Sequence, residues 1–205
     1  LILGVILGAF LIISLKGPLR AQTVGGPCEG CEAVLEYGDQ VLTSTDTLPE
    51  FEDHGNQMLI TGTVYKPDGR TPASGVILYA YHTNEKGVYP IKGNEKGWAR
   101  RHGYLRGWIK TDSNGQYSFY TFNPASYPSR TEPAHIHLTV KESDKNEYWI
   151  DSIQFEDDPL LTKEKIKKKR KRGGSGIVKL SKNSESYFLC NRDIVLGKNI
   201  PDYNN

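Results

Sequence analysis

The sequence is poor in the residues that build helical bundles, and it has no large excess of charge of either sign. It contains 1 Met and 3 Cys among 205 residues, and its 26 Lys and Arg nearly balance its 24 Asp and Glu. A net charge of +2 excludes a dominantly cationic protein that binds nucleic acid. The apolar run at residues 1–15 is shorter than the roughly 20 residues that cross a bilayer. A coiled coil and a polytopic membrane protein are therefore excluded.

The residues that are abundant indicate one β-rich globular domain. Hydrophobic residues make up 37% and aromatic residues 10%, which is enough for a packed core and too much for a disordered chain. The 21 Gly, 11 Pro and 12 Tyr favour a turn-rich β domain over a helical one. The length agrees with a single domain.

The amino terminus resembles a targeting segment. Residues 1–15, LILGVILGAFLIISL, have the length of the hydrophobic region of a signal peptide. The sequence has no initiator Met and no basic residues before this run, so it starts inside that segment. With Ala21 as a candidate cleavage position, we assign residues 1–21 to an incomplete signal peptide or N-terminal membrane anchor; a buried strand or helix is the alternative. We expect an exported protein, with membrane attachment through this segment left open.

The three cysteines are predicted to be structural. Cys28 and Cys31 are close enough in sequence to form a small disulfide in an oxidising compartment. They lie in a Gly- and Pro-containing segment, not at the start of a helix as a redox-active pair would, and no second pair completes a zinc site. Cys190 is expected to be a small core residue, although pairing with either of the others stays open. We treat residues 22–57 as a Cys-containing lead-in segment.

From residue 58 onward, apolar and polar residues alternate in short runs separated by turn signals. Such runs indicate strands at 58–65, 76–83, 115–122, 135–142, 148–156, 176–181 and 186–196. Turns such as Pro67-Asp68-Gly69 and Ser113-Asn114-Gly115 separate them. The predicted fold of residues 58–205 is all-β, a β-sandwich of antiparallel strands with long loops and one short basic helix.

The basic helix is predicted in the stretch LLTKEKIKKKRKR, which Gly173 and Gly174 follow. Residues 163–172 hold eight Lys or Arg against one Glu, so the rest of the chain carries a net negative charge. A patch that binds nucleic acid or another anionic surface is the functional alternative. Because no aromatic residues are interleaved with the basic ones, we interpret the run as a solvated helix and expect no nucleic-acid partner.

The stretch that carries chemistry is the His-x-His at positions 135 and 137. On a strand, residues two apart share a face, so His135, His137 and Thr139 point one way and Ile136 and Leu138 the other. Two imidazoles on one face can bind one metal ion, or they can be surface histidines on the wet side of a sheet. Two histidines leave a metal site incomplete, so further ligands must come from elsewhere in the chain.

Tyrosines are plentiful near this stretch, while acidic ligands are few. Tyr89 follows a Lys-Gly turn and Tyr127 precedes a Pro. Because a phenol has a pKa near 10, it binds well only to a strongly acidic cation such as Fe(III). Most other tyrosines are expected to be packing residues. Of the remaining histidines, His82 is expected in the core or next to the site, His102 in a solvated loop, and His54 is left unassigned.

Four motifs in this order resemble the intradiol ring-cleavage dioxygenases, relatives of protocatechuate and catechol dioxygenases. They are GVYP at 87–90, GQYSFYTFNPASYP at 115–128, PAHIH at 133–137 and QFEDDPL at 154–160. The stretch GWARRHGYLRGWIKTD is similar to the exported branch of that family. The resemblance covers roughly residues 59–196.

The resemblance implies a mononuclear, non-haem Fe(III) held by two tyrosines and two histidines, which match Tyr89, Tyr127, His135 and His137. By the geometry of the family, Tyr127 and His137 would be axial and Tyr89 and His135 equatorial. The implied reaction binds a catechol through both oxygens and displaces Tyr127, which takes up a proton. The substrates would be a small catechol-type aromatic and O2, and the product a muconate-type diacid.

Two positions depart from the family pattern. Well-studied members have an Arg three residues before the first histidine, where this chain has Glu132. Arg130, two residues earlier, is our candidate to reach the same space as a catalytic residue. Ser152 stands where these members have a Gln. These departures bear on rate and substrate preference more than on metal binding.

Two other functions are consistent with the sequence. The segment MLITGTVYKPDGRTPASGVILYAY by itself resembles transthyretin-like sandwich modules, which favours a non-catalytic binding protein. The replacement at Glu132 favours a family member that binds iron and has lost turnover. The enzyme hypothesis requires the two tyrosines and two histidines to converge, and the binding-module hypothesis requires them to lie apart.

Overall fold

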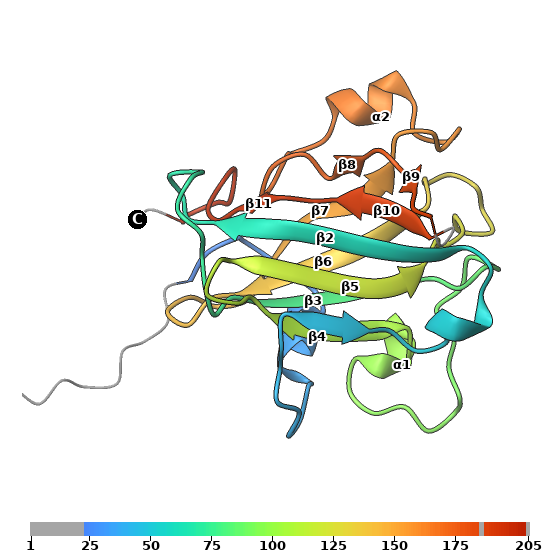
Figure 1. Ribbon diagram of the computed structural model, residues 1–205, viewed down its shortest axis with the longest axis horizontal. Helices are drawn as coiled ribbons and strands as arrows, with labels where there is room; N and C mark the ends of the chain where they lie inside the picture. Colours follow the sequence, from blue (N-terminus) through green and yellow to red (C-terminus); the bar gives the residue numbers. More distant parts are fainter. Residues whose placement is uncertain (1–22, 185–186, 204–205) are drawn as a thin grey trace, which may run out of the picture.

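The computed structural model describes residues 23–184 and 187–203, which form two β-sheets packed face to face (Figure 1). The apolar run at residues 1–15 lies outside the described residues. Within the described part of the chain, no helix is long and apolar enough to cross a membrane. The prediction of an all-β sandwich is confirmed.

The first sheet has the order β1-β5-β2-β10-β9, and β11 pairs with the far end of β2. Its strands are β1 (Thr45–Thr47), β2 (Gln57–Tyr65), β5 (Gln116–Phe122), β9 (Ser181–Lys182), β10 (Phe188–Asn191) and β11 (Ile194–Val195). The central pair, β2 and β5, is antiparallel, while β10 and β11 both run parallel to β2. The predicted strand at 186–196 is thus two short strands, and its first residue lies outside the described part.

The second sheet has the order β4-β3-β6-β7-β8 and carries the histidine motif on its middle strand. Its strands are β3 (Ile77–His82), β4 (Arg106–Lys110), β6 (His135–Lys141), β7 (Tyr148–Phe155) and β8 (Ile177–Val178). Neighbouring strands are antiparallel except for β7 and β8, and β6 has an irregular register with β7 between Ile136 and Leu138. The short strands β1 and β4 were not among those predicted.

Helices are short and lie outside the sheets. They are the α-helices α1 (Ala99–His102) and α2 (Lys163–Lys167) and the 3-10 helices η1 (Cys31–Leu35) and η2 (Phe51–Asp53). The side chain of Thr162 caps α2 by accepting a hydrogen bond from the backbone of Lys165. The helix ends well before the glycines that were predicted to end it, and Arg172 is buried, so the basic run is solvated only in part.

The core lies between the sheets and uses one face of each strand. Alternate residues of β2, Met58, Ile60 and Val64, are buried against Ile136 and Leu138 of β6. This placement confirms the alternation predicted for β6, because the core takes its even-numbered residues. His135, His137 and Thr139 are therefore left on the outer face of the second sheet.

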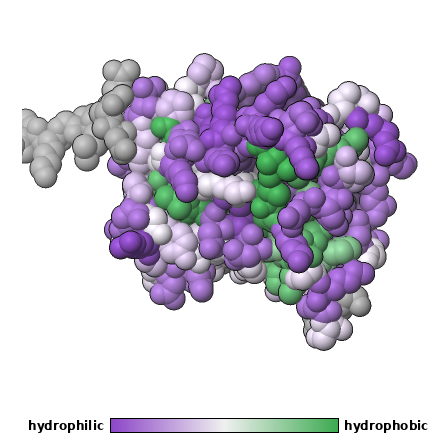
Figure 2. Space-filling model, turned by 90° about the horizontal axis from the view of Figure 1, so that it is seen from above, coloured by the Kyte–Doolittle hydropathy of each residue, from purple (hydrophilic) through white to green (hydrophobic). Residues whose placement is uncertain are grey.

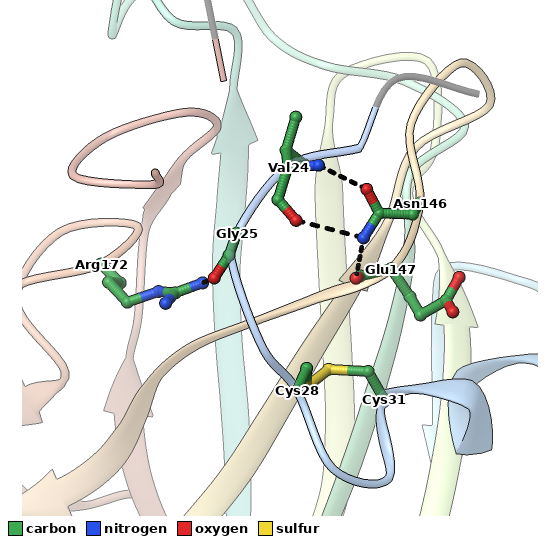
Figure 3. The surroundings of a disulfide bond; sticks show 7 residues. All are labelled: Val24, Gly25, Cys28, Cys31, Asn146, Glu147 and Arg172. Carbon is green, nitrogen blue, oxygen red and sulfur yellow. Dashed lines mark hydrogen bonds between the residues drawn. A yellow bond between two sulfur atoms is a disulfide. The ribbon is translucent and has the colours of Figure 1, made fainter. Parts of the chain in front are cut away.

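The segment predicted as a lead-in packs onto the domain along much of its length. The Cys28–Cys31 disulfide is formed, and Cys190 is a buried free thiol, as predicted for a core residue. Upstream of the disulfide, Val24 exchanges backbone hydrogen bonds with the side chain of Asn146, and the carbonyl of Gly25 accepts one from Arg172 (Figure 3). These contacts fix the amino-terminal segment along the second sheet.

The residues after the disulfide cover part of the outer face of that sheet. Ala33 and Val34 of η1 are fully buried against Tyr79 and Trp108, and the Trp108 indole donates a hydrogen bond to the carbonyl of Ala33. The 3-10 helix η1 thus covers the aromatic rings of β3 and β4, whereas the histidines of the adjacent strand β6 are not part of this apolar cluster.

Candidate metal centre

Four side chains converge at one end of the outer face of the second sheet, Tyr89, Tyr127, His135 and His137. The two phenol oxygens are 2.6 Å apart, and the Tyr89 oxygen lies 2.9 Å from Nε2 of His137. The Tyr127 oxygen lies 3.2 Å from Nε2 of His135, and the two Nε2 atoms are 3.0 Å apart. Four donor atoms therefore face a common point, although the residues are separated by up to 48 positions in sequence.

The two histidines come from β6, and their surroundings keep them neutral. Nδ1 of His135 donates a hydrogen bond to the carbonyl of Pro133, which leaves the lone pair of Nε2 directed at the phenols. Burial lowers the pKa of His135 and lowers that of His137 well below its ordinary value. Both imidazoles can therefore act as metal ligands at neutral pH without first losing a proton.

Tyr89 reaches the cluster from a tight turn after β3. The Asn84 side chain accepts hydrogen bonds from the backbone of Lys86 and Val88, and the Asn84 carbonyl accepts one from Gly87. Gly87 has a φ of 72°, and a Cβ there would lie 2.0 Å from the carbonyl oxygen of Ser126. Only glycine allows the two tyrosine-bearing loops to approach this closely.

Tyr127 and the approach to His135 are held by two polar contacts. Thr83 donates a hydrogen bond to the carbonyl of Ala125, which ties the end of β3 to the loop before Tyr127. The carboxylate of Asp158 accepts a hydrogen bond from the backbone of Ala134, directly before the first histidine. Asp158 belongs to the QFEDDPL motif, so this motif supports the histidine strand from its neighbour β7.

The surroundings of Tyr89 keep its phenol protonated in the absence of a metal ion. Burial raises the pKa of Tyr89, and the hydrogen bond with Tyr127 acts in the same direction. A phenolate ligand here requires a strongly acidic cation to displace the proton. Within the described residues, no group of three or more His, Cys, Asp or Glu side chains is arranged to hold a metal ion, so the phenols must complete any site at these histidines.

A stack of rings extends from His137 away from the cluster. Tyr81 pairs with His137 across β3 and β6 and stacks on it with ring centroids 4.5 Å apart. His102 stacks on the other face of Tyr81 at 3.9 Å and lies 2.9 Å from the Tyr79 hydroxyl. The prediction of a solvated loop for His102 is wrong, because the aromatic rings of β3 and the backbone of Gly30 enclose it.

The other candidate residues lie around the cluster. His82 is buried on the core side, as predicted, while His54 lies 2.9 Å from a carboxylate oxygen of Glu85. Ser152 Oγ is 3.5 Å from Nδ1 of His137. Arg130 is exposed, with a φ of 52°, in the turn that begins at Tyr127, and its role stays a prediction.

Two cavities lie next to the strand that carries the histidines of the cluster. One of about 290 Å³ is lined by Tyr81, His137, Ser152 and the disulfide loop. The other, of about 250 Å³, is lined by Glu132, Gln154 and lysines of the basic run, and Gln154 pairs with His135 across the sheet. Sequence reasoning missed Tyr81 and Gln154; their position opposite the two histidines follows only from the register of β6 with β3 and β7.

A protein-family model described as "Dioxygenase" matches residues 36–196. Catechol 1,2-dioxygenase 1 of Acinetobacter lwoffii is 30% identical over 156 residues, which are 68% of this chain and 47% of that protein. The β chain of protocatechuate 3,4-dioxygenase of Burkholderia cepacia is 27% identical over 161 residues, 76% of this chain and 66% of that one. The chain thus spans about half the length of the first relative and 66% of the second.

Solved structures share the fold at lower identity. Mercury-inhibited catechol 1,2-dioxygenase from Acinetobacter sp. ADP1 superposes with a TM-score of 0.57 at 21% identity, over 76% of this chain and 57% of that one. The dioxygenase domain of a carbohydrate-binding fusion protein from Streptomyces sp. SirexAA-E gives the same TM-score at 18% identity, over 88% of this chain and 98% of that domain. The second match spans a complete domain, which accords with the two-sheet architecture described above.

Proposed function

Because the chain belongs to the intradiol ring-cleavage dioxygenase family, we propose that it is an Fe(III)-dependent enzyme that cleaves catechol-type aromatics with O2 to muconate-type diacids. The observation that carries this proposal is the convergence of two phenol oxygens and two imidazole nitrogens, with neighbouring donor atoms 2.6 to 3.2 Å apart. A non-catalytic sandwich module would have no need to gather these four donors from two loops and a strand.

The donor set fits Fe(III) better than the other common metals. Zinc prefers thiolate and imidazole, and calcium prefers carboxylate and carbonyl oxygens, whereas this cluster offers two phenols and two imidazoles. Tyr89, Tyr127, His135 and His137 would hold the ion. When bound, Fe(III) would draw electron density from a coordinated diol and so make the ring reactive towards O2.

Tyr127 is the residue we assign to proton transfer. Both hydroxyl groups of a catechol must lose their protons before both oxygens can bind, and a phenolate at Tyr127 Oη can accept one of them. Tyr127 begins an exposed turn, closed by a hydrogen bond from the backbone of Arg130 to its carbonyl, so its side chain can move without breaking a sheet hydrogen bond. Tyr89, in contact with both Tyr127 and His137, is suited to remain in place.

The test is to load the purified protein with Fe(III) and to record its visible spectrum and its O2 uptake with catechol. Ferric tyrosinate should give a wine-red charge-transfer band, and Tyr127→Phe should shift that band and lower uptake strongly. Tyr120→Phe, on β5 away from the cluster, is the matched control and should change neither. A protein that stays colourless with Fe(III) would refute the proposal.

The alternative is a family member that binds iron without turnover. Glu132 favours it, because well-studied members of the family have an Arg at this position. In this chain the Glu132 carboxylate is half-exposed and pairs with Lys165 at 4.0 Å. A coloured protein that consumes no O2 with catechol, protocatechuate or hydroxyquinol would establish this alternative in place of the enzyme.

We also propose that the protein is exported. The Cys28–Cys31 disulfide supports this, since such bonds persist in oxidising compartments and are rare in the cytosol. Expression with a periplasmic signal peptide should give fully oxidised protein by thiol titration, with Cys190 as the remaining thiol. Equal thermal stability of cytosolic, reduced protein would contradict a requirement for export.

A further inference from the structure

The cavity beside His135 is lined by an unusual set of polar residues. The cavity has a volume of about 250 Å³ and is lined by Glu132, Gln154, Lys165, Lys168 and Lys169. The cavity adjoins the four-donor cluster, because Gln154 is the strand partner of His135. A molecule bound at the cluster would therefore have this cavity beside it.

The amide oxygen of Gln154 is buried and has no hydrogen-bond partner within the described part of the chain. The residue is 5% exposed, and among the described residues its Oε1 accepts no hydrogen bond. A buried acceptor without a donor is costly unless a bound molecule supplies one. Since Gln154 lines the cavity, it indicates an occupant that carries an O–H or N–H group, or that holds a water molecule there.

The lysines give the cavity an excess of positive charge. Lys165 is engaged locally, because it lies 4.0 Å from the Glu132 carboxylate and donates a hydrogen bond to the carbonyl of Thr131. Lys168 and Lys169 form no ion pair within 4.0 Å among the described residues. Two cations therefore remain for an anionic ligand.

Lys169 lies close enough to the candidate metal centre for their charges to interact. Burial lowers the pKa of Lys169, while the carboxylates of Asp151 and Glu132 act in the opposite direction. The charge of Lys169 in turn contributes to the lowered pKa of His135. Asp151 accepts hydrogen bonds from the backbone of Lys171 and Arg172, and within the described residues it forms no ion pair with Lys169 at 4.0 Å or less.

The chain places these lysines by ending α2 early and folding back onto β7. Arg170 and Arg172 both lie over the Trp149 ring, at 5.5 and 3.6 Å from its centroid. These contacts anchor the end of the basic run to the sheet, so Lys169 faces the cavity while the start of α2 stays on a largely hydrophilic surface (Figure 2).

We infer that Lys168, Lys169 and Gln154 form a subsite for a negatively charged substituent, so that the preferred substrates are catechols bearing a carboxylate. The two ammonium groups bind the carboxylate, and Gln154 Oε1 accepts a hydrogen bond from a ring hydroxyl or an ordered water. This inference rests on the proposed function, because the candidate metal centre places the aromatic ring beside the cavity. Lys168 and Lys169 are specificity-determining residues in this proposal and take no part in the chemistry.

The test compares two monophenols that cannot be cleaved, 4-hydroxybenzoate and its neutral analogue 4-hydroxybenzamide. Calorimetric titration of the iron-loaded protein at low salt should show the acid binding about tenfold more tightly, with the difference reduced at high salt because ions screen the lysines. Lys169→Gln should remove most of that preference and leave binding of the amide unchanged. Lys167→Gln makes the same change of charge on α2 outside the cavity and should keep the preference.

The possible results separate this inference from the proposed function. Equal affinity for acid and amide would overturn the lysine subsite even if the protein consumes O2 with catechol. An equal loss of the preference for the acid in Lys169→Gln and Lys167→Gln would overturn it as well. A preference for the acid that depends on Lys169, in a protein that consumes no O2 with any diol, would support the subsite and refute the enzyme. In an active protein, Lys169→Gln should raise KM for a carboxylated catechol by a larger factor than KM for catechol itself.

Discussion

The buried His82 makes a specific prediction about stability in acid. Its Nδ1 donates a hydrogen bond to the carbonyl of Thr83 at 2.7 Å, and its Nε2 lies 2.5 Å from the Thr121 hydroxyl, which donates to it. The ring is fully buried at the end of β3 and packs edge-on against Phe122. Each ring nitrogen of the neutral imidazole therefore has a hydrogen-bond partner, and burial disfavours the protonated form.

Burial lowers the pKa of His82 from 6.5 to about 4. A folded-state pKa below the unfolded one means that the unfolded chain binds the proton more readily, so acid favours unfolding. The stabilisation of the folded state by neutral His82 is fully present above pH 6.5. It falls as the pH drops from 6.5 towards 4 and changes little below that. A lowering of the pKa from 6.5 to about 4 corresponds to about 3 kcal/mol of unfolding free energy in total and about 2 kcal/mol by pH 5.

The assay is urea unfolding of the wild-type protein and His82→Gln at pH 7.5 and pH 5, with both proteins in the same metal state. The variant loses a buried contact and should be less stable at pH 7.5, but the gap between the two should shrink by about 2 kcal/mol at pH 5. Thr121→Val keeps the imidazole and should retain the pH dependence of the wild type. The same difference in unfolding free energy between wild type and His82→Gln at both pH values would refute the reasoning.

Two further predictions concern the segments that frame the site. Replacing Cys28 and Cys31 by Ser opens a loop with a sequence separation of 3 and should cost roughly 2 kcal/mol by the chain-entropy model. A drop in Tm of about 4–8 °C by calorimetry is expected, and an unchanged Tm would contradict it. Gly87→Ala forces a Cβ against the carbonyl of Ser126 and should abolish the charge-transfer band of the iron-loaded protein. Gly69 has a similar φ of 68° with open space around it, so Gly69→Ala should keep the band. An equal loss of the band in both variants would contradict the proposed clash at Gly87.

The strands that could be predicted from the sequence are those whose two faces differ in environment. β2 and β6 alternate because one face meets the core and the other meets solvent or the site. β4 was missed because Gly107, Trp108 and Ile109 are all buried, with Trp108 covered from outside by η1. A cover supplied by a distant segment leaves no periodic signal within the strand itself.

At the site, too, local sequence predicted some residues, whereas others depend on contacts between distant segments. That the two histidines share a face follows from strand parity, so local sequence was sufficient for them. That Tyr89 and Tyr127 meet them depends on two loops held together by long-range hydrogen bonds, and only the family resemblance suggested it. His102 was misplaced because its arginine-rich neighbours indicated solvent, while its ring is enclosed by residues that lie far from it in sequence.

On β6, the residues that stabilise the core and the residues of the candidate metal centre lie on opposite faces. Ile136 and Leu138 of β6 hold the sheets together from the inner face, whereas His135 and His137 face the outer side, where the loops bring the phenols. Residues of the outer face can therefore change without loss of the core, provided that the neutral imidazoles keep their surroundings. Glu132 and Lys169 line the cavity at this outer face, so under the proposed function substitutions there would change substrate preference and leave the four-donor cluster intact.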